Sequence, residues 1–223
     1  MSLPSARPLF CLVTDRRRLL PGNERRACDR LVDQVRAAAD AGVHIVQVRE
    51  RDLPARALAE LVARCLAATA GSGTRVVVND RLDVAIAAGA SGVHLREDSI
   101  GAGRARALGP AEFLVGRSIH QPEDADETGA DYLVFGTVFA TVSKPQGARV
   151  AGVEGLAAAA RRTALPVLAI GGVTLERVPL VSRAGAAGIA AIGLFQAPAG
   201  VGFDFAPTVL AARRAFDTSR ALV

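Results

Sequence analysis

Two arginines separated by a single residue suggest a site for a phosphorylated ligand. Arg49 and Arg51 flank Glu50 directly after the apolar run within 39–48, so both share one face if the strand continues. Two guanidinium groups on one face can hold phosphate oxygens through paired hydrogen bonds. We therefore predict phosphate binding by Arg49 and Arg51. The alternative is that an arginine pairs with Glu50 or with a helix end.

Two acidic residues follow later apolar runs. Asn79 ends the run 75–79 and Asp80 follows it, whereas Asp98 lies just beyond the run within 87–95. Neighbouring strands would bring the two carboxylates together, and Mg²⁺ favours one or two carboxylates with substrate phosphates and water. The pattern therefore predicts a magnesium site at Asp80 and Asp98. Each acid could instead cap the N-terminus of the helix that follows it.

A glycine pair and a single lysine extend the set of phosphate-binding candidates. Gly171 and Gly172 follow the apolar run 166–170 and precede a helix-like segment, where backbone N–H groups attract phosphate, although turn geometry alone could require them. Lys144 is the only lysine in the chain and stands near Thr141 and Ser143. Lysine is a compact charge on a flexible stem, so we expect this segment to fold over a phosphate. The alternative is a lysine retained by chance on an exposed loop.

The three histidines differ in their expected roles. His120 follows the apolar run 113–116 and is the best acid–base candidate, because the pKa of histidine lies close to neutral pH. His44 begins a predicted strand, at the end opposite to the polar residues, and we expect it to be structural. His94 falls inside a predicted strand, where it could fill the interior or bond its neighbours.

The elements that must position these residues repeat along the chain. An alanine-rich helical pattern, a glycine that can end the helix, and a short apolar strand recur in 39–48, 87–95, 127–135 and 183–192. Further strands are expected at 9–14, 75–79, 113–116 and 166–170, with helices at 24–40, 55–69, 81–88, 99–107, 121–128, 152–163, 174–184 and 205–216. Eight alternating strand–helix units predict an α/β fold, a single-domain TIM (β/α)8 barrel over residues 1–223. An open doubly wound sheet is the alternative, although no GxGxxG follows the first strand.

The barrel prediction places the chemistry at one end of the molecule. Active sites of such barrels lie at the C-terminal ends of the strands and in the loops that follow. Reading those places in order gives a polar, partly cationic ring: Thr14, Asp15, Gln47, Arg49, Arg51, Asn79, Asp80, His94, Asp98, Ser118, His120, Thr141, Ser143, Lys144, Gly171, Gly172 and Gly193. Such a ring suits a phosphorylated substrate together with a metal ion.

Composition excludes several other classes of protein. The formal charge is +5, but the arginines are scattered among acids, which disfavours nucleic-acid binding. No apolar run reaches the length of a membrane span, about 18 residues. Cys11, Cys28 and Cys65 are isolated, so we expect buried free thiols and a cytoplasmic location.

Several motifs in order resemble one known family. VQVRER (46–51), VVNDRLDVAIAAGASGVHLREDS (77–99), GRSIH (116–120), GADYLVFGTVFATVSKP (129–145) and VLAIGGV (167–173) are similar to the thiamin phosphate synthase superfamily. The resemblance covers most of the chain. It implies a TIM barrel that uses Mg²⁺ and couples a hydroxymethylpyrimidine pyrophosphate to a thiazole phosphate, with release of pyrophosphate. It allows a homodimer.

The resemblance also assigns roles to the ring residues. Gln47 would contact the pyrimidine, Arg49 and Arg51 would hold the pyrophosphate beside Asn79, and the magnesium would bind the two aspartates. The residues that would line the substrate phosphates and the pyrimidine are Ser118, Thr141, Ser143 and Lys144. The thiazole phosphate would lie against the glycine pair, Gly171 and Gly172.

The sequence also departs from the synthase pattern. Arg51 stands where synthases usually have lysine, HLRED replaces the usual Gly-Gln before Glu-Asp, and the segment GIAAIGLF before and around Gly193 is one residue short. RER, GRSIH and FGTVF are closer to the sister group of thiazole tautomerases, where His120 would move a proton without magnesium.

We favour the synthase, because the residues expected in its active site are retained: Gln47, Asn79, Asp80, Asp98 and Lys144. A tautomerase has less need of these residues. A third hypothesis is a barrel that binds a phosphorylated ligand without catalysis, which the intact acids at both predicted metal positions disfavour.

Overall fold

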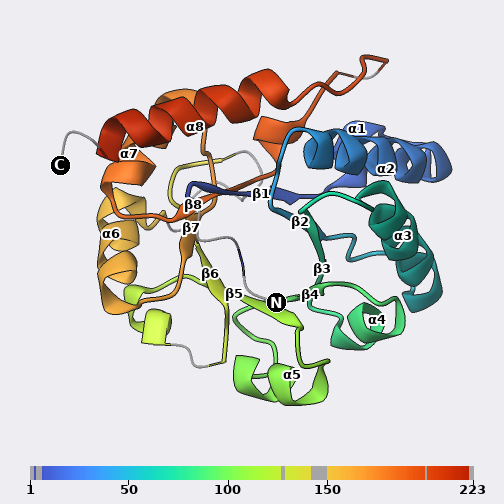
Figure 1. The fold of residues 1–223 in the computed structure, drawn as a ribbon, viewed down its shortest axis with the longest axis horizontal. Helices are drawn as coiled ribbons and strands as arrows, with labels where there is room; N and C mark the ends of the chain where they lie inside the picture. Colours follow the sequence, from blue (N-terminus) through green and yellow to red (C-terminus); the bar gives the residue numbers. More distant parts are fainter. Residues whose placement is uncertain (1–2, 4–6, 127–128, 142–149, 199, 221–223) are drawn as a thin grey trace.

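The chain forms a closed barrel of eight parallel strands (Figure 1). The computed structural model describes residues 3, 7–126, 129–141, 150–198 and 200–220. Each strand pairs with the next in the sequence, and the last pairs with the first. The strands are β1 (Leu9–Val13), β2 (Ile45–Val48), β3 (Arg75–Asn79), β4 (Gly92–Leu95), β5 (Leu114–Ile119), β6 (Tyr132–Phe135), β7 (Val167–Ala169) and β8 (Gly188–Ala191). The predicted TIM barrel is therefore confirmed, and the open sheet is wrong.

Helices form an outer ring around the strands (Figure 1). They are α1 (Arg16–Leu19), α2 (Glu24–Asp40), α3 (Ala55–Ala68), α4 (Leu82–Ala87), α5 (Ala102–Leu108), α6 (Gly152–Arg162), α7 (Val178–Arg183) and α8 (Ala206–Arg220). Short 3₁₀ turns are η1 (Pro122–Asp126), η2 (Leu175–Arg177) and η3 (Gly193–Phe195). No helix among the described residues is long and apolar enough to span a bilayer.

The helix predictions need correction at two places. In the segment expected as a helix at 121–128, Pro122–Asp126 form the 3₁₀ turn η1, and residues 127–128 lie outside the described part of the chain. The Asp124 side chain accepts from the Gln121 backbone N–H and caps the start of this turn. The segment expected at 174–184 divides into η2 and α7. Pro179 lies at the start of α7, and because it has no backbone N–H the helical ladder cannot run through it.

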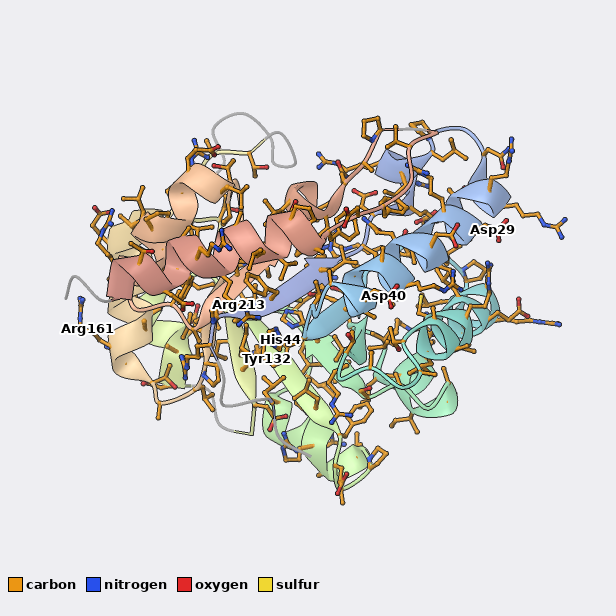
Figure 2. All side chains as sticks on the ribbon, turned by 45° about the horizontal axis from the view of Figure 1, so that its top comes forward. Asp29, Asp40, His44, Tyr132, Arg161 and Arg213 are labelled. Atoms are coloured by element: carbon orange, nitrogen blue, oxygen red, sulfur yellow. The ribbon has the colours of Figure 1, made fainter. Side chains whose placement is uncertain are left out.

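The core has two layers. Apolar residues on the outer faces of the strands pack beneath the helices, and a smaller aliphatic set fills the barrel interior, as the low aromatic content requires. Tyr132 is the large exception inside the barrel, and Gly116 on the neighbouring strand leaves room for its ring, which a side chain there would meet. Figure 2 places Tyr132 near the middle of the molecule, whereas Asp29 and Arg161 lie at its periphery.

His44 lies just before β2, at the N-terminal end of the barrel. Its Nδ1 accepts a hydrogen bond from the Phe10 backbone N–H at 3.0 Å, and its ring stacks on the Phe10 ring. Burial and nearby Arg213 lower the pKa of His44. The structural role expected for this histidine agrees with these contacts.

Candidate active site

A cavity of about 1100 Å³ opens at the C-terminal ends of the strands, and every strand end contributes to its wall. Most of the predicted site residues line it: Gln47, Arg49, Arg51, Asn79, Asp98, Ser118, His120, Thr141, Gly171, Gly172 and Gly193. Asp80 is not part of the wall. Ser143 and Lys144 lie outside the described residues.

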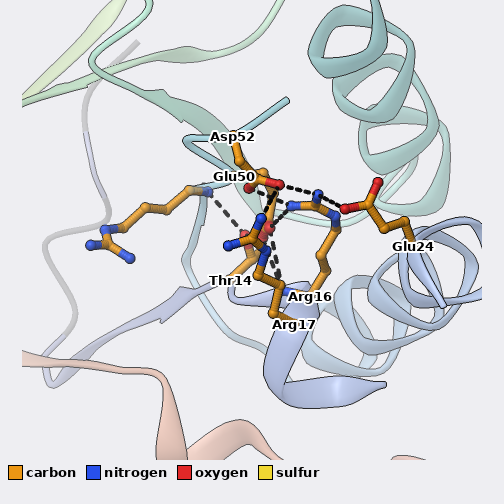
Figure 3. A network of polar contacts seen from close by, with 7 residues as sticks. Thr14, Arg16, Arg17, Glu24, Glu50 and Asp52 are labelled. Carbon is orange, nitrogen blue, oxygen red and sulfur yellow. Dashed lines mark hydrogen bonds and ion pairs between the residues drawn. The ribbon is translucent and has the colours of Figure 1, made fainter. Parts of the chain in front are cut away.

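A buried ion-pair network beside the cavity fixes the segment that carries the two arginines (Figure 3). Arg16 is 1% exposed, and its Nη1 lies 3.0 Å from Glu50 Oε2 and 2.8 Å from Asp52 Oδ1. Thr14 Oγ1 donates to Glu50 Oε1 at 2.7 Å and accepts from the Arg49 backbone N–H at 2.9 Å.

This network determines where the neighbouring arginines point. Glu50 is held by Arg16 and Thr14, so the alternative in which Glu50 pairs with Arg49 or Arg51 is wrong. Neither of these arginines forms a salt bridge with a described acidic side chain, and both line the cavity. Burial and the adjacent Arg51 lower the pKa of Arg49, which is the expected effect of concentrating positive charge.

Two buried amides join β2 to β3 in the cavity wall. Gln47 Nε2 donates to Asn79 Oδ1 at 2.9 Å, and the two residues are 4% and 8% exposed. Each side chain therefore has a fixed orientation beside the arginines. Buried amides of this kind orient a ligand through hydrogen bonds that a freely moving side chain would form at a greater cost in entropy.

His94 connects the barrel interior with the cavity. Its Nδ1 lies 3.1 Å from the Tyr132 hydroxyl and its Nε2 lies 2.9 Å from Ser118 Oγ. Burial lowers the pKa of His94 to about 3, so the ring is neutral at neutral pH. The expectation that His94 bonds its neighbours inside the barrel is confirmed, and its effect is to orient Ser118 at the cavity wall.

His120 lies in the wall between two acceptors. Its Nδ1 contacts the Gly136 carbonyl oxygen, which requires a proton on Nδ1, and its Nε2 lies 3.7 Å from Glu97 Oε2. Both His120 and Glu97 line the cavity. This arrangement presents Nε2 to the cavity beside the Glu97 carboxylate.

The two predicted metal ligands, Asp80 and Asp98, both contact the side chain of Arg96. Arg96 Nη1 lies 3.5 Å from Asp80 Oδ2, and Arg96 Nη2 lies 2.5 Å from Asp98 Oδ2. Asp80 also accepts from Ser99 Oγ, and its backbone adopts a φ of 63°, which is unusual for a residue other than glycine. The helix-cap alternatives are wrong, because the cap positions of α4 and α5 are Arg81 and Gly101.

The donor set at these acids suits Mg²⁺. Two carboxylates already meet one cationic group, and this ion commonly binds one or two protein carboxylates with substrate phosphates and water. Within the described ranges no group of three His, Cys, Asp or Glu side chains converges as a complete metal cage. The residues therefore fit a metal ion that is shared with a phosphorylated substrate.

The glycine pair brings backbone close to the cavity. Gly171 and Gly172 have φ values of 99° and 61°, and an added Cβ would lie 2.6 Å from Thr137 Cγ2 and 2.6 Å from the Ala140 carbonyl oxygen respectively. Arg177 Nη1 donates to the Gly172 carbonyl at 2.7 Å. Turn geometry thus does require these glycines, as the alternative held, and the same geometry exposes their backbone in the cavity wall.

Residues 11–195 match the model of a family described as thiamine monophosphate synthase. The chain belongs to this family.

Individual relatives agree with the family. A thiamine-phosphate synthase of Roseiflexus sp. is 40% identical over 192 residues, covering 85% of this chain and 78% of the relative. One from Anaeromyxobacter dehalogenans is 43% identical over 164 residues, covering 72% and 73%. The solved thiamine phosphate pyrophosphorylase from Pyrococcus furiosus has a TM-score of 0.77 and 30% identity, covering 95% of this chain and 96% of that one.

Sequence reasoning missed several charged residues around the cavity. Arg18, Arg96, Glu97 and Glu176 line it, and Arg16 lies buried behind it. The signal for Arg96 was present, because HLRED places an arginine beside two acids at a strand end. Arg16 had no such signal, since RRRL offers three equal arginines and only the fold determines which of them is buried.

Proposed function

We propose that this chain is a thiamin-phosphate synthase, a transferase that joins a hydroxymethylpyrimidine pyrophosphate to a thiazole phosphate. The C–O bond between the pyrimidine methylene and the pyrophosphate breaks, and its electron pair leaves with the pyrophosphate. The lone pair of the thiazole nitrogen then forms the new C–N bond. The observation that carries this proposal is the pair of arginines Arg49 and Arg51, which form no salt bridge with a described acidic side chain, in the wall of a cavity in a member of this family.

Each part of the cavity has a task in this reaction. Arg49 and Arg51 bind the leaving pyrophosphate and stabilise the charge that it gathers. Gln47 and Asn79 orient the pyrimidine and the adjoining phosphate. The other proposed substrate contacts are Ser118, His120, Thr141, Ser143, Lys144 and Gly193.

The glycine backbone is proposed to receive the thiazole phosphate. Gly171 and Gly172 stand across the barrel mouth from the arginines, after β7 rather than β2, so two phosphorylated substrates can bind on opposite sides of one cavity. Backbone N–H groups in a glycine-rich turn bind phosphate without the steric hindrance of a side chain.

Magnesium is proposed as the cofactor. Asp80 and Asp98 would hold it, and when bound it would stabilise negative charge on the leaving pyrophosphate. The three free cysteines support a reducing compartment, and we propose a cytoplasmic location for the enzyme. The homodimer stays a prediction.

One observation favours the alternative activity, thiazole tautomerisation. His120 presents Nε2 in the cavity while Nδ1 contacts a backbone carbonyl, which is the arrangement that proton transfer on a thiazole ring would use. The names of the relatives favour coupling. Arg49 and Arg51, which form no salt bridge with a described acid, favour it too, because tautomerisation releases no pyrophosphate.

Product analysis tests the proposal. The protein is incubated with the pyrimidine pyrophosphate, the thiazole phosphate and Mg²⁺, and thiamin phosphate is measured by chromatography. Arg161→Met serves as a surface control, because Arg161 is exposed on α6 at the periphery (Figure 2). Thiamin phosphate formed by wild type and by Arg161→Met supports the proposal. A thiazole that is isomerised and never coupled overturns it.

A further inference from the structure

Arg96 occupies the place between the two acids that the proposed metal needs. Its guanidinium spans both carboxylates, with separate nitrogens directed to Asp80 and Asp98. The loop that carries it is fixed, because the Arg96 backbone N–H donates to Ser99 Oγ at 2.9 Å and Ser99 in turn contacts Asp80. The arginine is therefore an internal counter-ion at this position.

The backbone of this loop is tied to the barrel, whereas the Arg96 side chain reaches the cavity. Arg117 on β5 donates to the carbonyl oxygens of Glu97 at 2.9 Å and Ile100 at 2.8 Å, which ties the loop backbone to the barrel. The Arg96 side chain is 42% exposed and lines the cavity. A long side chain with this exposure can turn from the acids to an anion in the cavity without moving the loop.

We propose that Arg96 competes with the divalent cation for Asp80 and Asp98, and that a pyrophosphate group in the cavity draws Arg96 away from them. This inference rests on the proposed function and extends it. A guanidinium and a divalent ion that bind the same pair of carboxylates repel each other at short range, so each weakens the binding of the other. Pyrophosphate offers the guanidinium paired acceptors in exchange for the carboxylates.

Competition of this kind couples two ligands. A ligand that takes Arg96 away from the acids raises their affinity for the metal, and the metal must raise affinity for that ligand by the same factor. The free enzyme accordingly binds the metal weakly, and the complete cationic site assembles only around a pyrophosphate. The proposed synthase would then avoid holding a divalent ion when no substrate is present.

Titration with Mn²⁺ as the metal probe tests the first half of the proposal. Binding is followed by the loss of the electron paramagnetic resonance signal of aqueous Mn²⁺, with no substrate present. Arg96→Gln should bind Mn²⁺ about tenfold more tightly than wild type, a change of about 1.4 kcal/mol. The double variant Arg96→Gln with Asp98→Asn should lose this gain. Thermal melting of each variant checks that it is folded.

Arg51→Gln is the matched control for the metal titration. It removes the same charge from the same cavity, but Arg51 forms no salt bridge with a described acid. We expect its affinity for Mn²⁺ to change by less than about threefold, the scale of a screened interaction. Equal Mn²⁺ affinity in wild type and Arg96→Gln would overturn the proposal. An equal gain in Arg51→Gln would also overturn it, because the effect would then be general charge.

Calorimetry with inorganic pyrophosphate in the presence of a chelator tests the second half. Arg96→Gln should bind metal-free pyrophosphate about tenfold more weakly, as expected for one lost charge-assisted contact. Unchanged affinity would overturn the claim that pyrophosphate attracts Arg96. The coupling assay tests the proposed function separately. If wild type forms thiamin phosphate but Arg96→Gln binds Mn²⁺ no more tightly than wild type, this inference is refuted and the proposed function stands. If Arg96→Gln binds Mn²⁺ more tightly but wild type forms no thiamin phosphate, only the proposed function is refuted.

Discussion

Replacing Arg16 with methionine should destabilise the protein by about 3–5 kcal/mol, the usual cost of removing one partner from a buried ion pair. The structure gives the reason: Arg16 is 1% exposed and contacts Glu50, which is 4% exposed, as well as Asp52 (Figure 3). The variant leaves the Glu50 carboxylate buried with only Thr14 and backbone donors. We expect a fall in Tm of roughly 10 °C in a chain of this size.

Arg17→Met is a matched control for this experiment. Arg17 is the neighbouring residue and contacts the same Asp52 at 3.0 Å, but its side chain is 67% exposed. Removing an exposed partner should cost less than about 1 kcal/mol. The double variant Arg16→Met with Glu50→Leu should recover about half of the loss, because it removes the unpaired charge.

The destabilisation should depend on pH with a defined sign. Burial raises the pKa of Glu50 above its ordinary value of 4.5, so its contribution to stability is present below that pH and is lost as pH rises through the folded pKa. The hydrogen bond from Arg16 lowers the pKa of Asp52 to about 2, so that contribution is present above 3.8 and is lost as pH falls. Arg16 lowers the pKa of Glu50 against the larger effect of burial, so Arg16→Met raises this pKa further and the variant loses more stability than wild type as pH rises above 4.5. The Asp52 contribution is present throughout pH 4–8 and is lost only as pH falls from 3.8 towards 2. The deficit of Arg16→Met should therefore grow from pH 4 to pH 8 through Glu50.

Urea unfolding of wild type and the three variants between pH 4 and pH 8 measures this effect directly. A deficit below about 1 kcal/mol for Arg16→Met, or one that is equal at pH 8 and pH 4, would refute the reasoning. So would an equal deficit in Arg17→Met, since exposure is the difference between the two arginines.

Three further predictions concern residues that line the cavity. Arg49→Met should lower kcat/KM for coupling about 10- to 100-fold, the scale of a lost hydrogen bond to a charged group, and an unchanged value would remove Arg49 from the site. Gly172→Ala should raise KM for the thiazole phosphate more than KM for the pyrimidine, because its φ is 61° and a Cβ would meet Ala140; equal steady-state effects would count against this role. The ring resonances of His94 should not titrate between pH 5 and pH 8 in NMR spectra, because burial lowers its pKa to about 3; a midpoint near 6.5 would contradict its buried position.

The sequence predicted the elements well because their signals are local. The range 24–40 agrees with α2, since Asn23 caps the start, accepting from the Arg26 backbone N–H, and Gly42 with a φ of 79° follows the end. Strand positions followed from apolar runs. The failures were at η1, where the described residues form a 3₁₀ turn, and before α7, where Pro179 interrupts a pattern that is otherwise typical of a helix.

The sequence predicted the position of the candidate site better than it predicted which charged side chains pair with one another. The order of strand ends is enough to place Arg49, Asn79 and Gly171 around one cavity. The partners of charged groups depend on packing between distant elements, as the pairing of Glu50 with Arg16 across 34 positions shows. For the same reason HLRED indicated that Arg96 stands beside acids at a strand end, but not that it pairs with Asp80 from the neighbouring strand end.

In the proposed reaction, the C–O bond between the pyrimidine methylene and the pyrophosphate breaks in this cavity. One reaction mixture containing both substrates and Mg²⁺ tests it most directly, when pyrophosphate, thiamin phosphate and isomerised thiazole are measured together over time. We expect equal rates of pyrophosphate and thiamin phosphate formation, reduced far more by Arg49→Met than by His120→Gln. Isomerised thiazole without any pyrophosphate, lost in His120→Gln and retained in Arg49→Met, would contradict it.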